Sequence, residues 1–217
     1  MQPIKNIIFD FGNVLFDLEL GAISRELKQL TGSQFESIKN KLDQSGVFQL
    51  YETGGITTEE FVDTLCRAAR PVLEPEQVIY AWNSIFVGMP RERFDRVLEL
   101  RQHYQVFLLS NINDLHARWI DDYLWREHNM EDFQARYFDA VYYSHLIRLR
   151  KPDREIYEYV LADAGLVPEE SVFIDDLEEN IEAARQLGIR TIHKTPDLDI
   201  MQLMGRFLSE KTTSALR

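Results

Sequence analysis

The segment IIFDFGNV, residues 7–14, decides the fold, because it contains a short apolar run that ends in polar and turn residues. Comparable runs rich in Ile, Val and Phe occupy residues 4–10, 106–110, 140–144 and 172–175, with a shorter one at 191–193. Apolar runs of this length without polar alternation are typical of strands buried on both faces. They predict a parallel sheet covered by helices on both sides, a three-layer Rossmann-like α/β core.

Helical segments are expected between these strands, because parallel neighbours need crossover connections. Apolar residues recur at helical spacing in residues 152–164 and 178–187, and a glycine follows each segment. We also expect a last helix at residues 197–208 and a frayed tail at residues 210–217.

A long stretch without a convincing strand separates the first strand from the second. Apolar residues recur there at helical spacing in four segments, residues 19–30, 33–42, 58–70 and 75–86. Thr57 followed by Glu60 forms a capping box, which predicts the start of the third helix.

These helices predict an insertion into the α/β core. We expect a helical cap domain at residues 17–90 and a catalytic core formed by residues 1–16 and 91–217. Within that core, residues 91–103 are expected to return to the sheet as a crossover helix.

The charge balance limits the classes of partner. The 217 residues include 24 Lys and Arg against 36 Asp and Glu, a formal net charge of −12. Nucleic acid is therefore an improbable partner, because a polyanion would be repelled. A phosphorylated substrate would be repelled too, so such an enzyme needs a metal ion and a few fixed cations inside its site.

The sequence favours a cytoplasmic protein with no membrane partner. No run approaches the roughly 20 apolar residues that span a bilayer, and the start MQPIKNIIFDFGN lacks the pattern of a secretory signal. Cys66 is the only cysteine, so an intramolecular disulfide and a multi-cysteine zinc site are both excluded. The sequence does not decide between a monomer and a homodimer.

Polar side chains follow the predicted strands where these end. They are Asp10, Ser110, Asn111, Asp175 and Asp176, and Lys151 lies in the loop before the helix at residues 152–164. The carboxyl ends of parallel strands meet at one edge of a sheet, so we expect these side chains to lie close together.

Each of these residue types has a use in phosphoryl transfer. A carboxylate on a rigid strand end can attack phosphorus and form a covalent intermediate. Several carboxylates in a small space attract a divalent cation, and Mg²⁺ prefers such oxygen ligands. A hydroxyl, an amide and an ammonium can hold the phosphoryl oxygens and balance the charge of the transition state.

Four motifs in the expected order resemble those of the haloacid dehalogenase-like hydrolase superfamily. They are IIFDFGNV at residues 7–14, VFLLSN at 106–111, RKPD at 150–153 and VFIDDLEEN at 172–180. The resemblance covers nearly the whole core, and the helical insertion lies at the family's first cap position. The string DFGNV is also similar to bacterial glucose-1-phosphate phosphatases and to the N-terminal phosphatase domain of some epoxide hydrolases.

The resemblance implies a role for each motif residue. Asp10 would be the nucleophile and a magnesium ligand, the backbone carbonyl of Gly12 a second ligand and Asp176 a third. Asp175 would act through water or by orienting its neighbours, and Asn180 would support the loop. Ser110 and Asn111 would bind the phosphoryl group, and Lys151 would pair with both that group and Asp10.

One position departs from the family pattern. Most phosphatases of this superfamily carry an aspartate two residues after the nucleophile, which protonates the leaving oxygen and later activates water, but this chain has Gly12. Loss of such acid–base help costs about 10²–10⁴ in rate. A phosphomutase is improbable without that acid, whereas a phosphatase with a good leaving group, such as an anomeric phosphate, remains feasible.

The expected activity is therefore Mg²⁺-dependent hydrolysis of a small phosphorylated metabolite, such as glucose 1-phosphate, through an aspartyl-phosphate. A 2-haloacid dehalogenase is an alternative because halide needs no proton, although the acidic pair Asp175 and Asp176 favours a metal and hence phosphate. A phosphate-binding or regulatory protein with weak turnover is the other alternative.

Overall fold

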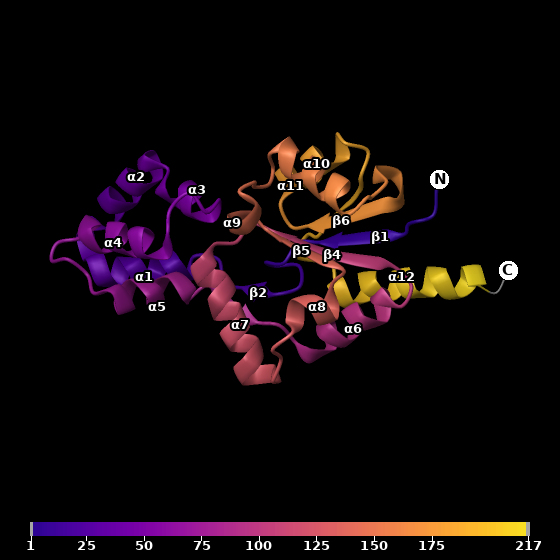
Figure 1. The fold of residues 1–217 in the computed structure, drawn as a ribbon. Helices are drawn as coiled ribbons and strands as arrows, with labels where there is room; N and C mark the ends of the chain where they lie inside the picture. Colours follow the sequence, from indigo (N-terminus) through magenta and orange to yellow (C-terminus); the bar gives the residue numbers. More distant parts are fainter. Residues whose placement is uncertain (1, 216–217) are drawn as a thin grey trace.

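The computed structural model describes residues 2–215, with side-chain surroundings through residue 209. Its main sheet has five parallel strands in the order β5-β4-β1-β6-β7 (Figure 1). The strands are β1 (Asn6–Phe9), β4 (Gln105–Ser110), β5 (Ala140–Tyr143), β6 (Ser171–Asp175) and β7 (Arg190–His193). The predicted parallel sheet is thus confirmed.

Helices cover both faces of this sheet and make three layers. One face is covered by α6 (Arg91–Arg101), α7 (Asp114–His128), α8 (Phe133–Tyr137) and α12 (Ile200–Ala215), and the other by α10 (Arg154–Asp163) and α11 (Glu178–Arg185). Side chains of a strand alternate between the faces, so Ile7 and Phe9 pack into the first apolar cluster and Ile8 into the second.

The C-terminal helix is longer than predicted. Because no Pro or Gly interrupts residues 210–215, α12 continues to Ala215. The prediction of a frayed tail is therefore wrong for residues 210–215, and residues 216–217 lie outside the described part of the chain. Between residues 2 and 215, no helix combines the length and the apolar character needed to cross a membrane.

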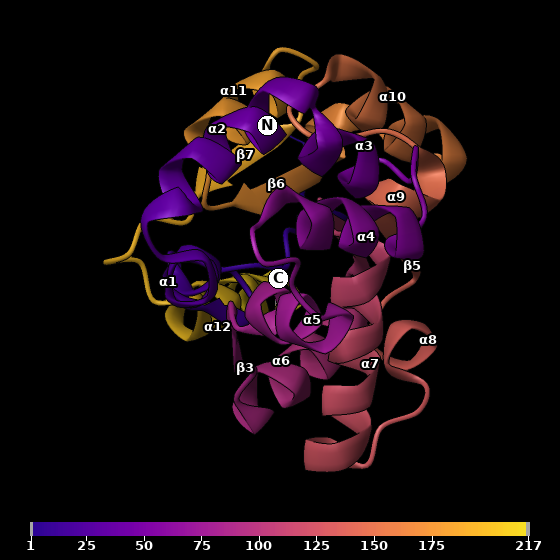
Figure 2. The same cartoon turned by 90° about the vertical axis from the view of Figure 1, so that its left-hand side faces the viewer.

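Five α-helices lie between the short strands β2 (Asp17–Leu18) and β3 (Phe86–Gly88). We call them the cap helices: α1 (Ala22–Thr31), α2 (Phe35–Ser45), α3 (Val47–Glu52), α4 (Thr58–Ala68) and α5 (Pro75–Asn83). They share an apolar cluster in which the rings of Tyr51 and Phe61 stack with centroids 4.1 Å apart. The predicted capping box at Thr57 and Glu60 is confirmed. Figures 1 and 2 show these helices grouped beyond one end of the sheet.

A short antiparallel ribbon joins the cap helices to the rest of the chain. Strand β2 (Asp17–Leu18) pairs with β3 (Phe86–Gly88), so the chain enters and leaves the cap helices side by side. Arg93 ties the ribbon to α6, because its Nη1 donates to the carbonyl of Leu15 and to Oδ1 of Asp17, each at 2.8 Å. The predicted boundaries at residues 17 and 90 fall beside this ribbon, and the division into two domains stays a prediction.

Candidate active site

The carboxyl ends of β1 and β6 bring three aspartates together. The parallel register places Phe9 beside Ile174, and the amide of Asp10 donates to the carbonyl of Ile174 at 2.8 Å. One carboxylate oxygen from each of Asp10, Asp175 and Asp176 lies within 4.8 Å of the other two. The predicted convergence of these strand ends is therefore present.

Lys151 lies buried among these carboxylates, with 2% of its side chain exposed. Its Nζ donates to Oδ1 of Asp10 at 2.7 Å, to Oδ2 of Asp175 at 2.6 Å and to the carbonyl of Leu109 at 3.0 Å. Asn111 fixes its backbone, because the Lys151 amide donates to Asn111 Oδ1 at 2.9 Å and Asn111 Nδ2 donates to the Lys151 carbonyl at 2.8 Å. The ammonium is thus aimed at Asp10 by the loop that follows β4.

The contacts of Asn111 and Ser110 differ from one another. Both donor and acceptor atoms of the Asn111 side chain are used by Lys151, so this amide positions the lysine. Ser110 is buried at the end of β4 and faces the pocket described below. Phosphoryl binding by these two residues stays a prediction.

Asp175 and Asp176 have different surroundings. Asp175 is fully buried, and besides Lys151 it accepts from the amide of Leu177 at 2.8 Å and from Nδ2 of Asn180 at 2.9 and 3.0 Å. Asp176 is half-buried, and its Oδ2 accepts from Nδ2 of Asn13 at 3.2 Å. This arrangement supports the roles proposed for Asp176 as a direct ligand and for Asp175 as an orienting group held by Asn180.

The residues present fit a divalent cation. Three carboxylates face one ammonium, so the cluster carries excess negative charge, and its hard oxygen donors are those that Mg²⁺ prefers. Burial raises the pKa of Asp10 to about 7, against the attraction of Lys151 and with added repulsion from Asp175. Burial by itself would lower the pKa of Lys151. The attraction of Asp10 and Asp175 outweighs that effect, so the pKa of Lys151 is raised.

Magnesium affinity should therefore depend on pH. In the metal-free folded protein, Asp10 holds a proton below its raised pKa of about 7, and a cation must displace that proton. We expect the Mg²⁺ association constant to fall by up to about tenfold for each pH unit below 7 and to level off above it. Calorimetric titration of the protein with Mg²⁺ on both sides of pH 7 measures this, and an affinity independent of pH would contradict it.

The loop after Asp10 fills the space that an acidic side chain at Gly12 would need. The carbonyl of Phe11 accepts from the amides of Leu15 and Phe16, which folds the loop back on itself. A Cβ built on Gly12 would lie 2.7 Å from Cδ1 of Leu18. The side chain of Leu18 thus occupies part of the space that a side chain at Gly12 would need. Binding of a metal by the Gly12 carbonyl stays a prediction.

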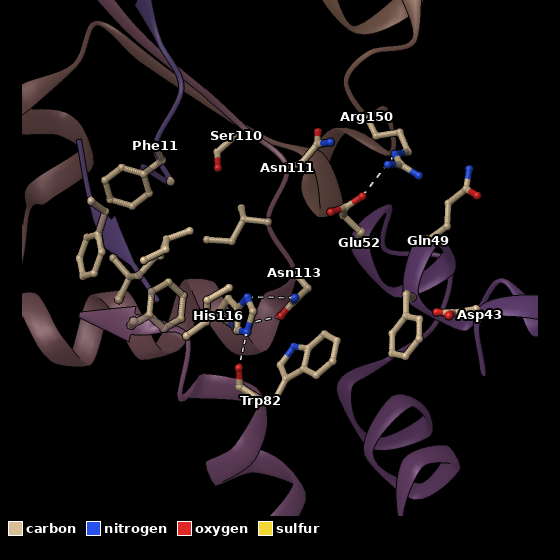
Figure 3. Close-up of a pocket in the computed structure, with 18 of the residues that line it drawn as sticks. Phe11, Asp43, Gln49, Glu52, Trp82, Ser110, Asn111, Asn113, His116 and Arg150 are labelled. Atoms are coloured by element: carbon tan, nitrogen blue, oxygen red, sulfur yellow. Dashed lines mark hydrogen bonds and ion pairs between the residues drawn. The ribbon is translucent and has the colours of Figure 1, made fainter. Parts of the chain in front are cut away.

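A pocket of about 510 Å³ opens between the ends of the strands and the cap helices (Figure 3). Gly12, Ser110 and Asn111 form part of its wall. Aromatic side chains line the pocket together with polar ones, among them Gln49, Glu52 and Arg150, which lie on one side of it, and Asn113, which lies beside Trp82.

The aromatic residues of the cap divide between two roles. Tyr51 is buried in the apolar cluster of the cap helices, as expected for a core residue. Phe48 and Trp82 stack with centroids 5.6 Å apart and also line the pocket, as does Phe86. Sequence reasoning missed the pocket residues Glu52 and Asn113, because no motif contains them.

Arg148 has no contact with the pocket. It is exposed and adopts a left-handed backbone conformation with φ of 59° at the end of α9 (Ser144–Ile147). A glycine would adopt that conformation without steric cost. Arg148 is a surface arginine and not part of the pocket wall.

Comparisons with known proteins agree with this geometry. The sequence profile of the haloacid dehalogenase-like hydrolases matches residues 122–194. A D-ribitol-5-phosphate phosphatase from Bacteroides thetaiotaomicron is 30% identical over 92% of this chain and 96% of its own length. A sesquiterpene phosphatase from Aspergillus oryzae is 28% identical over 93% of this chain and 97% of its own length.

A solved structure of the same family is also similar to this chain. A haloacid dehalogenase family enzyme from Bacteroides thetaiotaomicron, in complex with magnesium and inorganic phosphate, superposes with a TM-score of 0.81 at 35% identity, over 92% of this chain and 98% of that one. The sequence relationship spans nearly both chains, and the fold and the motif order agree with it. The carboxylate cluster of this chain fits the metal that this structural relative binds. The chain therefore belongs to the haloacid dehalogenase-like hydrolase family.

Proposed function

We propose that this enzyme is a phosphatase that hydrolyses the phosphate monoester of a small sugar or sugar alcohol through an aspartyl-phosphate on Asp10. The observation that carries the proposal is the contact between Oδ1 of Asp10 and Nζ of Lys151, 2.7 Å long, inside a cluster of three carboxylates. The chain neighbours Phe11, Gly12 and Arg150 line the adjoining pocket. An ammonium and a divalent cation together offset the repulsion between the acidic site and a phosphate.

Each residue of the site has a separate role in the proposed reaction. Asp10 attacks phosphorus, the bond to the leaving oxygen breaks, and the phosphoryl group is carried on the Asp10 carboxylate until water removes it. Lys151 holds Asp10 in place and faces the transferring group, and Ser110 offers a hydroxyl to a phosphoryl oxygen. Asp10 and Asp176 would hold magnesium, which when bound would supply positive charge to balance the phosphoryl oxygens.

The polar wall of the pocket supports a hydroxylated leaving group. Glu52, Arg150, Gln49 and Asn113 offer both hydrogen-bond donors and acceptors, and a volume of about 510 Å³ accommodates a five- or six-carbon chain. The relative that acts on D-ribitol 5-phosphate makes sugar-alcohol phosphates the first substrates to examine, with glucose 1-phosphate as the anomeric alternative. A terpenyl phosphate would leave the polar groups of this wall unpaired.

A panel of phosphate monoesters tests the function. We expect purified protein with Mg²⁺ to release inorganic phosphate from ribitol 5-phosphate or a sugar phosphate, and we expect EDTA to abolish release because the carboxylate cluster then lacks its counter-ion. Farnesyl phosphate and 2-haloacids serve as comparison substrates. Phosphate release from none of the esters, or halide release without metal, would refute the proposal.

A further inference from the structure

The proposed phosphatase reaction, on which this inference rests, needs a proton at the leaving oxygen. An alkoxide of a sugar or sugar alcohol is a poor leaving group, so protonation by a side chain contributes about 10²–10⁴ to the rate. Gly12 carries no such side chain, and Leu18 fills the adjacent volume. The donor must therefore come from another part of the pocket wall.

The described residues that line the pocket include three side chains that titrate below neutral pH in their usual state: Asp43, Glu52 and His116. His116 is held by the protein at both ring nitrogens, by Asn113 Nδ2 at 3.2 Å and by the carbonyl of Trp82 at 3.0 Å. Burial lowers the pKa of His116 to about 4, so it is neutral and fully hydrogen-bonded. Its one N–H proton is donated to the carbonyl of Trp82 and is not directed at a substrate.

Asp43 is also unsuited to the role. It is exposed on α2, and its Oδ2 accepts from Nζ of Lys39 at 2.7 Å, four residues away on the same helix. Asp43 therefore pairs within its own helix and faces solvent. Among the titratable groups of this wall, Glu52 is left.

The carboxyl of Glu52 lies on the polar side of the pocket, next to Arg150 and on the same side as Asn111 (Figure 3). Its Oε2 is 3.2 Å from Nε of Arg150, and 29% of each side chain is exposed. The pair is poorly aligned, because Nε of Arg150 is buried without a hydrogen-bond partner of good geometry. The Glu52 carboxyl is therefore not locked in a bidentate pair and keeps an oxygen for a ligand.

The backbone places Glu52 at a fixed position relative to the phosphoryl site. The carbonyl of Glu52 accepts from Oγ of Ser144 at 2.7 Å, and the same Oγ accepts from the amide of Ile112 at 2.9 Å, two residues beyond Ser110. Oη of Tyr51 accepts from the amide of Leu115 at 3.0 Å. The end of α3 is thus tied to the loop that carries Ser110 and Asn111.

Gly54 allows this close docking. Its backbone has φ of +65°, and a Cβ at this position would lie only 2.2 Å from the carbonyl oxygen of His145. Any other residue would push the end of α3 away from α9. The approach that places Glu52 in the pocket therefore requires the glycine.

The electrostatic surroundings of Glu52 suit a proton donor. Burial raises its pKa, and the attraction of Arg150 and Lys151 acts in the opposite direction without cancelling the rise. Since Lys151 influences Glu52, the carboxyl lies within electrostatic reach of the group that contacts Asp10. A carboxyl whose pKa moves toward neutrality is a better general acid at neutral pH.

We propose that Glu52 is the general acid and base of this enzyme and replaces the aspartate that Gly12 lacks. As Asp10 attacks phosphorus and the bond to the leaving oxygen breaks, the Glu52 carboxyl gives its proton to that oxygen and becomes a carboxylate. In the second step the carboxylate takes a proton from the attacking water, the bond between phosphorus and Asp10 breaks, and inorganic phosphate leaves. Glu52 is then protonated again, and the sum is one ester and one water giving one alcohol and one phosphate.

The test compares Glu52→Gln with the wild-type protein on two kinds of ester. With a sugar or sugar-alcohol phosphate, we expect E52Q to lose about 10²–10⁴ in kcat, because the leaving alkoxide needs the proton. With p-nitrophenyl phosphate, whose leaving group needs none, we expect a rapid burst of about one nitrophenolate per enzyme followed by slow turnover, because only hydrolysis of the aspartyl-phosphate needs the base. Stopped-flow absorbance measures the burst.

Glu158→Gln is the matched control, because it makes the same carboxyl-to-amide change at an exposed residue of α10 that pairs with Arg154 and lies outside the pocket, and we expect its kcat on both esters to stay near the wild-type value. An unchanged kcat in E52Q, or an equal loss on both esters in the first turnover, would overturn the role of Glu52 while leaving the phosphatase function intact. A wild-type protein that hydrolyses neither ester would overturn both proposals.

Discussion

Replacing Asp10 with asparagine should lower turnover by about 10⁴–10⁶-fold, the range seen when a covalent nucleophile is removed. The amide nitrogen cannot attack phosphorus, and the neutral side chain also removes one of the carboxylates that face the metal. The fold should survive, because Lys151 keeps its 2.6 Å contact with Asp175. Phosphate release from the substrate of the wild-type protein measures the effect.

The control for this variant is Asp63→Asn, which removes a carboxylate that pairs with Arg67 on the surface of α4. We expect no change in its kcat. Intact-mass measurement of D10N guards against conversion of the asparagine back to aspartate. Turnover of D10N within tenfold of the wild type would mean that Asp10 is not the nucleophile.

Replacing Lys151 with methionine should produce the largest loss of stability. The change leaves the buried carboxyls of Asp10 and Asp175 without their shared cation, and removal of one partner of a buried ion pair costs about 3–5 kcal/mol. For a chain of this size each kcal/mol lowers the Tm by about 2–4 °C. We expect Mg²⁺ to restore part of the loss, because it binds the folded carboxylate cluster.

The loss of stability in K151M should also depend on pH. Burial raises the pKa of Asp10, so at lower pH this carboxyl becomes neutral and needs the lysine less. The destabilisation of K151M relative to the wild type should therefore shrink as the pH falls and grow as it rises. Lys39→Met, on the exposed surface of α2, should leave the Tm nearly unchanged, and an equal fall of Tm in both variants would refute the argument.

The core of the fold is readable from the sequence because its strands are buried on both faces. The runs that begin at Ile7, Val106 and Val172 contain only apolar residues until a polar residue ends each run. The short α3 is not readable in this way, because six residues are too few to establish a helical period. The ribbon of β2 and β3 is shorter still, and tertiary pairing alone defines it.

Some residues of the site could be predicted from the sequence, and Glu52 could not. Asp10, Lys151, Asp175 and Asp176 could be grouped from the sequence because parallel strands end at a common edge, and the structure places them within contact of one another. Glu52 could not be grouped with them. Its position depends on the docking of α3 against α9 through Ser144 and Gly54, and no local pattern encodes a contact between segments so far apart.

The ribbon has a further consequence for how the chain reaches this structure. Strands β1 and β4 pair although the whole length of the cap helices separates them in the sequence. The entropic free-energy cost of closing such a loop grows with its length, by about 0.6 kcal/mol for each doubling. When Asp17 is already paired with Gly88, the intervening helices no longer count as free chain. The ribbon then shortens the effective loop between β1 and β4. A shorter loop lowers the effective contact order of the sheet, so we expect the two strands to pair faster.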